Sequence, residues 1–146
     1  WREHAPVVPV GIEQLLQSDP LLVNEHEGAL LLDLLGVPFA ESDPATLVSA
    51  LLAQGFASVV MTLGAEGSIV GDADGLTDIP TPQITAVDTT GSGDAFAGAL
   101  VAKLAEGATL IEASCFAARV GAFAATRPGA QASYPTLDST LPTVND

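Results

Sequence analysis

Apolar residues fall into short runs that suit buried strands and into longer segments of helical composition. Three short runs, at 21–23, 57–63 and 84–87, are bounded by turn residues and predict buried strands. The turn-rich stretch 64–82 contains further short runs and predicts a small antiparallel hairpin or meander. The Pro-rich stretch 5–10 predicts a loop. The segments with helical composition are 11–17, 25–35, 44–55, 94–104 and 109–126.

The order of these elements predicts one α/β domain. Strands that alternate with helices form a mostly parallel sheet covered by helices on both faces, a three-layer αβα arrangement. One helix start is well marked, because Asp43 is a good cap residue and Pro44 suits the first helical position. Ligands of such sheets bind beyond the carboxyl ends of the strands, so the loops after Val23, Leu63 and Val87 are expected at the functional edge.

The charge of the chain is strongly unbalanced. Eighteen Asp and Glu residues face four Lys and Arg residues, for a formal net charge of -14. Nucleic acids and anionic membranes are bound mainly through Lys and Arg, so the composition argues against both as partners. A phosphorylated ligand would have to be held by backbone amides and metal ions.

The single cysteine and the absence of export signals indicate a cytoplasmic protein. Cys115 lies within an apolar helical pattern and predicts a buried, reduced thiol. No apolar run reaches the roughly 18 to 20 residues that span a bilayer, and the first residues lack the zones of a signal peptide. Because the chain begins with Trp1 instead of Met, we expect it to be a piece of a longer protein.

The segment 87–98 carries the strongest chemical signal. Gly91, Ser92 and Gly93 come directly before a predicted helix, so free backbone N–H groups and the positive end of the helix dipole converge on one spot. An anion such as a γ-phosphate would be stabilised there without lysine. Asp94 adds a carboxylate that suits a general base for an attacking hydroxyl, although an Asp in a first helical turn can also be structural. The segment matches neither a Walker loop nor a dinucleotide-binding Gly-x-Gly-x-x-Gly motif.

Residues 88–96, Asp-Thr-Thr-Gly-Ser-Gly-Asp-Ala-Phe, resemble the C-terminal signature of the PfkB family of carbohydrate kinases. The similarity extends over residues 21–133. The resemblance implies a ribokinase-like, Rossmann-like fold, of which residues 1–146 form only the C-terminal, ATP-binding portion. It also implies that Asp94 is the catalytic base and contacts both the substrate hydroxyl and ATP. The amides of Gly91, Ser92 and Gly93 would form an anion hole for the transferred phosphoryl group, with Gly93 also contacting ATP.

Two loops after earlier predicted strands resemble the same family. Asn24-x-x-Glu27 is similar to its Asn-x-x-Glu motif, which implies that Asn24 contacts ATP and that Glu27 helps to hold Mg²⁺ through water. His26 has no second histidine at a ligand spacing, so zinc is not expected. The stretch 62–67 would by itself be an ordinary turn, but the resemblance implies that it lines the nucleotide site. Its residues are Thr62, Leu63, Gly64, Ala65, Glu66 and Gly67.

The stretch 126–133, after the last predicted helix, contains a Gly-Ala-Gln-x-Ser run that resembles a cation-binding segment of the family. By itself its Pro-Gly pair is only a helix stop. The resemblance implies an activating monovalent cation, K⁺, held largely by backbone oxygens. The implied ligands are Asp88, Thr90, Ala124, Arg127, Gly129 and Ser133. Many family members carry Asn or His beside the adenine where this chain has Ala118, so one polar contact to the base is expected to be missing.

The activity implied by the resemblance is ATP-dependent phosphorylation of a sugar hydroxyl, with D-ribose favoured as acceptor, ribose 5-phosphate as product, and Mg²⁺ and K⁺ as cofactors. Another sugar or nucleoside kinase, such as a fructokinase-like enzyme, stays open, because the N-terminal sugar-binding part and its lid are absent from this chain. A non-catalytic nucleotide-binding fragment is the other alternative, since this portion alone is expected to bind nucleotide weakly and phosphorylate little. The implied partners are a small-molecule sugar and ATP, and a homodimer would form through the lid of the full-length protein.

Overall fold

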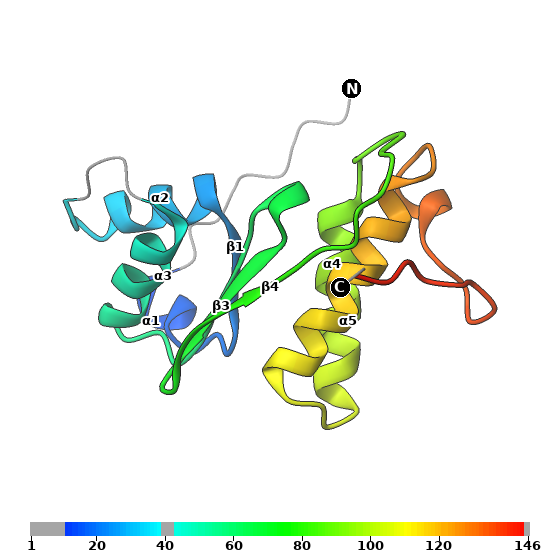
Figure 1. Ribbon diagram of the computed structural model, residues 1–146. Coiled ribbons are helices and arrows are strands. Elements are labelled where there is room, and N and C mark those ends of the chain that lie inside the picture. Colours follow the sequence, from blue (N-terminus) through cyan, green and yellow to red (C-terminus); the bar gives the residue numbers. More distant parts are fainter. Residues whose placement is uncertain (1–10, 39–42, 145–146) are drawn as a thin grey trace.

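A four-stranded sheet lies between two layers of helices, which confirms the three-layer αβα arrangement (Figure 1). The computed structural model describes residues 11–38 and 43–144, so the loop predicted at 5–10 lies outside the described residues. In these ranges no helix is long and apolar enough to cross a membrane. The elements are α1 (Ile12–Leu15), β1 (Leu21–Asn24), α2 (Glu25–Leu34), α3 (Pro44–Ala53), β2 (Val59–Thr62), η1 (Gly64–Glu66), β3 (Ser68–Asp72), β4 (Gly75–Ile79), α4 (Ser92–Ala105), α5 (Leu110–Ala125) and η2 (Gln131–Ser133).

The sheet is mixed, with the strands in the order β1-β2-β3-β4. Strands β1 and β2 are parallel, whereas β2 pairs with β3 and β3 with β4 in antiparallel fashion. The hairpin predicted within 64–82 is therefore confirmed, but the sheet of this chain is less parallel than predicted. The reason is local, because the chain returns from β2 to β3 through the short η1 turn, and a parallel pair would need a much longer crossover.

The prediction of a strand at 84–87 is wrong. The segment is extended, but it pairs with no strand within the described ranges. Helix α5 holds its end instead, because the N–H groups of Val87 and Asp88 donate to the carbonyl of Ala125 at 2.8 and 3.2 Å. The Val87 side chain is 63% exposed. The apolar run at 84–87 is therefore held against the C-terminal end of α5 and forms no ladder with a described strand.

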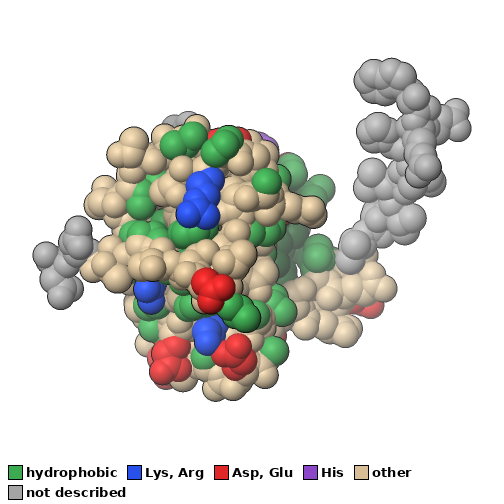
Figure 2. All heavy atoms as spheres, turned by 90° about the vertical axis from the view of Figure 1, so that its right-hand side faces the viewer, with side chains coloured by type: hydrophobic (Ala, Val, Ile, Leu, Met, Phe, Trp, Pro, Cys, Tyr) green, Lys and Arg blue, Asp and Glu red, His purple; other side chains and the backbone are tan. Residues whose placement is uncertain are grey.

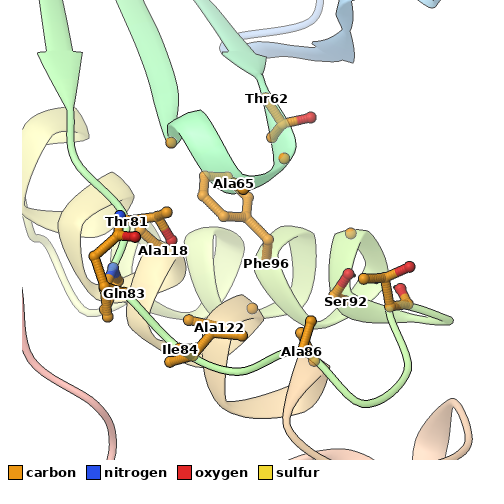
Figure 3. A pocket seen from close by; sticks show the side chains of 17 residues that line it. Thr62, Ala65, Thr81, Gln83, Ile84, Ala86, Ser92, Phe96, Ala118 and Ala122 are labelled. Carbon is orange, nitrogen blue, oxygen red and sulfur yellow. Dashed lines mark hydrogen bonds between the residues drawn. The ribbon is translucent and has the colours of Figure 1, made fainter.

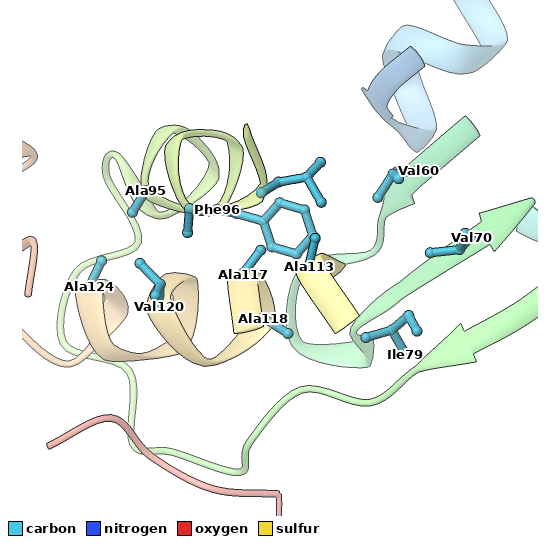
Figure 4. Packing of buried hydrophobic residues seen from close by; sticks show 12 residues of the cluster. Val60, Val70, Ile79, Ala95, Phe96, Ala113, Ala117, Ala118, Val120 and Ala124 are labelled. Atoms are coloured by element: carbon cyan, nitrogen blue, oxygen red, sulfur yellow. The ribbon is translucent and has the colours of Figure 1, made fainter. Parts of the chain in front are cut away.

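The alternation of side chains along the strands divides the core in two. Val59 and Met61 of β2 belong to a buried cluster with α2 and α3, while Val60 between them belongs to a second cluster with α4 and α5. Figure 4 shows this second cluster, in which the sheet faces Phe96 of α4 and the alanines of α5. Each layer of helices is thus fixed to its own face of the sheet by apolar contact.

Helix α5 buries small side chains along most of its length. Ala113, Ala117 and Ala124 have 0% exposure, which lets the helix pack closely on α4 and on the sheet. Cys115 is exposed on the outer side of the same helix, so the prediction of a buried thiol is wrong. An apolar run does not show which of its members points outward, because this depends on how the helix is rotated against its neighbours.

Candidate functional site

A pocket of about 380 Å³ opens between the η1 turn, the segment that follows β4, and helices α4 and α5 (Figure 3). Its volume lies within the range of pockets that bind small molecules. Most of its walls are apolar, and polar groups come from a few side chains and from backbone. The residues of the predicted catalytic and nucleotide sites that line it are Thr62, Gly64, Ala65, Gly67, Ser92 and Gly93.

The N-terminus of helix α4 forms one end of this pocket. Gly91 has a φ of 78°, a left-handed conformation that favours glycine, and a Cβ there would collide with the backbone of the loop after α5. The Ser92 hydroxyl donates to the carbonyl of Thr89 at 2.7 Å, which closes the turn into the helix. No acceptor within the described residues pairs with the N–H groups of Gly93 and Asp94. These amides are therefore available to an anion.

Asp94 lies in the first turn of α4, directly after the pocket-lining Gly93. Its side chain is exposed and takes part in no ion pair within the described residues. Asp94 itself does not line the pocket, but its exposed carboxylate is free to accept a hydrogen bond from an incoming hydroxyl. The helix dipole also favours a negative charge at this position, so the arrangement fits a structural role as well.

The η1 turn supplies the wall opposite α4. Thr62, Gly64, Ala65 and Gly67 line the pocket, whereas Leu63 and Glu66, predicted for the same site, do not. The Leu63 N–H donates to the Gly67 carbonyl at 2.8 Å, which closes the turn. Gly67 has a φ of 100° and is buried. This conformation brings backbone, instead of side chains, to the surface of the pocket.

Asn24 and Glu27 form the N-terminal cap of helix α2 and do not line the pocket. The Asn24 Oδ1 atom accepts from the Glu27 N–H and the Glu27 Oε2 atom accepts from the Asn24 N–H, both at 2.9 Å. Asn24 pairs in register with Thr62, so this cap adjoins the pocket. His26 is exposed, and the described residues contain no cluster of three or more His, Cys, Asp or Glu side chains that could hold a metal.

The predicted cation ligands come together where the 88–90 turn meets the loop after α5. Asp88 accepts the N–H of Thr90 with Oδ1 at 2.9 Å and the N–H of Gly129 with Oδ2 at 2.8 Å. The hydrogen bond from Gly129, followed by those from Thr90, holds the pKa of Asp88 below its usual value. Ser133 is buried in the same loop and donates from Oγ to the carbonyl of Ala130 at 2.6 Å.

Two further predicted ligands belong to the end of α5. Ala124 is fully buried, and its carbonyl already accepts the Arg127 N–H at 3.3 Å. Arg127 is exposed and its guanidinium lies over the Phe123 ring at 4.1 Å from the centroid. Only backbone oxygens of these residues could take part in a cation site. The atoms of this loop that could bind a cation are therefore all oxygens, which suits a hard cation.

The basic side chains of the described residues lie in the α4–α5 layer, on the face that Figure 2 shows, and none lines the pocket. Lys103 pairs with Glu106 at 2.6 Å, and Arg119 donates to the carbonyl of Pro142 at 2.9 Å. Arg127 stacks on an aromatic ring, as described above. An anion in the pocket would therefore meet backbone amides and hydroxyls, as the composition predicts.

Comparison with known proteins decides the family. The model of the pfkB family of carbohydrate kinases matches residues 3–137. The chain belongs to this family. A ribokinase from Schizosaccharomyces pombe is 34% identical over 135 residues, which are 91% of this chain and 42% of that protein. The chain thus spans less than half the length of this PfkB relative.

Solved structures of PfkB proteins share the fold. A ribokinase from Thermotoga maritima superposes with a TM-score of 0.76 at 34% identity, covering 84% of this chain and 41% of the other. A putative ribokinase II from Escherichia coli, solved in complex with ATP and Mg²⁺, gives a TM-score of 0.71 at 27% identity, covering 84% and 38%. The predicted ribokinase-like fold is therefore confirmed.

Ala118, expected beside the adenine, lines the pocket. Two further parts of the wall of this PfkB chain were missed from sequence: the extended segment after β4, and the small residues next to Ala118 on α5 with Phe96 of α4 beside them. The small residues at 118, 121, 122 and 125 follow the i, i+3, i+4, i+7 spacing of one helix face. The same spacing is typical of a face that packs tightly in the core, so it does not by itself indicate a ligand site. The residues not foreseen are Thr81, Pro82, Gln83, Ile84, Ala86, Thr89, Phe96, Gly121, Ala122 and Ala125.

Replacing Asp88 by Asn is expected to lower stability by an amount that depends on pH. Because the hydrogen bonds from Gly129 and Thr90 lower the pKa of Asp88 in the folded state, the fold favours the ionised carboxylate. This stabilisation is fully present above the pKa of the unfolded chain, about 3.9, and is lost as the pH falls through the lower folded pKa. Urea denaturation should give a constant difference between the two proteins above about pH 6, and a shrinking one below about pH 4.

The control for this pH series is Asp78→Asn, at an exposed carboxylate on β4. It is expected to change stability little at any pH, because surface substitutions outside such contacts have small effects. A difference for Asp88→Asn that stayed constant down to pH 2 would contradict the assignment of these hydrogen bonds to the ionised form.

Proposed function

We propose that the protein transfers the γ-phosphoryl group of ATP to a sugar hydroxyl, with O5 of D-ribose as acceptor. The observation that carries this proposal is the end of the pocket at α4, where the unpaired amides of Gly93 and Asp94 adjoin the Asp94 carboxylate. Such a site attracts a phosphate and offers a base beside it. The PfkB family membership agrees with this chemistry.

In the proposed reaction the amides at the start of α4 stabilise the charge on the transferred phosphoryl group. Asp94 accepts the proton of the sugar hydroxyl while the oxygen of that hydroxyl forms a bond to the γ-phosphorus. The bond from this phosphorus to the bridging oxygen breaks, and ADP leaves with the electron pair. Thr62 and Gly64 line the pocket, and in this proposal they contact the phosphates.

Two cations complete the proposal. Glu27 keeps its Oε1 atom free of the α2 cap, so one carboxylate oxygen could hold Mg²⁺ through water, in keeping with the few protein ligands that this ion takes. When bound with ATP, Mg²⁺ would neutralise phosphate charge. K⁺ would be held by the oxygens around Asp88 and Ser133, and would order the loop that precedes α4.

The acceptor is tested by a coupled assay of ADP release from the full-length protein with ribose, fructose and adenosine, using EDTA to define the zero rate. Ribose is expected to give a kcat/KM about tenfold or more above the other two, because a site that hydrogen-bonds one set of hydroxyls leaves polar groups unpaired with the others. A preference for fructose or adenosine would assign another acceptor within the same chemistry. ATP binding with no transfer to any acceptor would support the non-catalytic alternative.

A further inference from the structure

The pocket extends along helix α5, and its two ends differ. At one end, Ala125 accepts the N–H groups of Val87 and Asp88, next to the start of α4. At the other end, Ala118 lies on the same helix, and both alanines line the pocket. Their separation of seven residues corresponds to roughly 10 Å at about 1.5 Å per residue. A nucleotide whose phosphates rest on the α4 amides therefore has its base beside Ala118.

The base end of the pocket has few polar side chains. Its wall on α5 consists of Ala118, Gly121 and Ala122, none of which has a hydrogen-bonding side chain. The polar side chains here come from Thr81 and Gln83, on the extended segment after β4, and Figure 3 shows them beside Ala118. Side-chain recognition of the base therefore falls to these two residues.

We propose that Gln83 reads the purine base and accepts adenine and guanine alike; this inference rests on the nucleotide site proposed above. A side-chain amide has an acceptor oxygen and a donor nitrogen. In one orientation it accepts from the N6 amino group of adenine and donates to adenine N1. Rotated by half a turn, it donates to guanine O6 and accepts from guanine N1–H.

The surroundings of Gln83 leave both orientations open. The side chain is exposed, and no hydrogen bond within the described residues fixes its amide. The Thr81 hydroxyl can also either donate or accept, so it does not favour one base. Strong discrimination needs a fixed polar group that the wrong ligand leaves unpaired. Among the side chains that line the base end of this pocket, none is such a fixed polar group.

The test is a calorimetric titration of the full-length protein, in the presence of Mg²⁺, with ATP, GTP and the base-free probe tripolyphosphate. ATP and GTP are expected to bind within about fivefold of each other. Gln83→Ala should weaken both by roughly five- to tenfold and leave tripolyphosphate binding unchanged, because it removes hydrogen bonds to the base only. Gln83→Glu should shift the ratio of affinities towards GTP by about tenfold or more, since a carboxylate accepts both N1–H and N2–H of guanine but repels N1 of adenine.

The matched control is Gln54→Glu, which introduces the same charge at the end of α3, away from the pocket. It should leave the ratio of ATP to GTP affinity unchanged. In either Glu variant, a weaker binding of tripolyphosphate would show that the added negative charge repels the phosphates. If ATP binds more than about twentyfold better than GTP, or if Gln83→Glu leaves the ratio unchanged, the base-reading role of Gln83 is overturned while the nucleotide site stands. If the full-length protein binds neither ATP nor tripolyphosphate, the proposed function itself fails.

Discussion

Asp94→Asn is expected to reduce sugar phosphorylation by about 10²- to 10⁴-fold, the contribution typical of a general base, and to leave ATP affinity within about threefold. The substitution keeps the size and the position of the side chain but removes its ability to accept a proton. The amides of Gly93 and Asp94 stay in place, so the phosphates should still bind. The measurements are steady-state kinetics with saturating sugar and calorimetric titration with ATP, both on the full-length protein.

The control for this prediction is Asp138→Asn, at an exposed carboxylate in the C-terminal segment. It should leave both measurements unchanged. A second control is the free energy of unfolding, because loss of an acidic residue from the first turn of α4 is expected to cost only about 0.3–1 kcal/mol. Near-normal turnover of Asp94→Asn would show that Asp94 has only a structural role, and the assignment of the base would be wrong.

Gly67→Ala is expected to destabilise the protein by on the order of 3 kcal/mol or more, the largest effect on stability that we predict. Gly67 has φ 100° and ψ -132°, a conformation that residues with a Cβ rarely adopt. A Cβ there would also overlap the carbonyl oxygen of Ile79 and lie 3.2 Å from the N atom of Thr81. Since these are backbone atoms of and next to β4, relief of the clash would require separation of the β3–β4 hairpin.

The matched control is Gly64→Ala in the same turn. Gly64 has a φ of 60°, but a Cβ there would meet nothing within 4 Å. Its replacement should therefore cost only the conformational term of about 1–2 kcal/mol. Urea denaturation of the three proteins gives the comparison. Equal costs for both variants would show that the contact with Ile79 relaxes, and that only the backbone conformation matters at Gly67.

Much of the fold could be predicted from local sequence. The short apolar runs at 21–23 and 57–63 become β1 and β2, and the capped start at Asp43 and Pro44 begins α3 as expected. Such signals are reliable because strands and helix caps depend on residues that are close in sequence. The run at 84–87 has the same composition as a strand but no partner strand within the described residues, and composition alone cannot report whether a partner exists.

Some residues of the candidate site could likewise be predicted from local sequence, and others could not. The start of α4 could be identified as a candidate anion site because glycines at a helix N-terminus leave backbone amides open. Asn24 and Glu27 were predicted as ligand residues, yet the structure also engages them as the cap of α2, a role that their spacing allows equally well. Gln83 gave no signal, because it lies in an extended segment with no motif around it.

The sequence by itself determined the α/β class and placed the helices to within about two residues, although α4 begins at Ser92 and not at Asp94. It also predicted a lysine-free anion site at the start of α4, since both signals depend on neighbouring residues and on backbone geometry. The tertiary structure decided the rest. Packing of α5 on the sheet places Ala118 opposite Gln83, turns Cys115 outward, and brings the loop at Gly129 to Asp88. These residues are far apart along the chain, and their meeting depends on how whole elements rotate and pack, which no local pattern encodes.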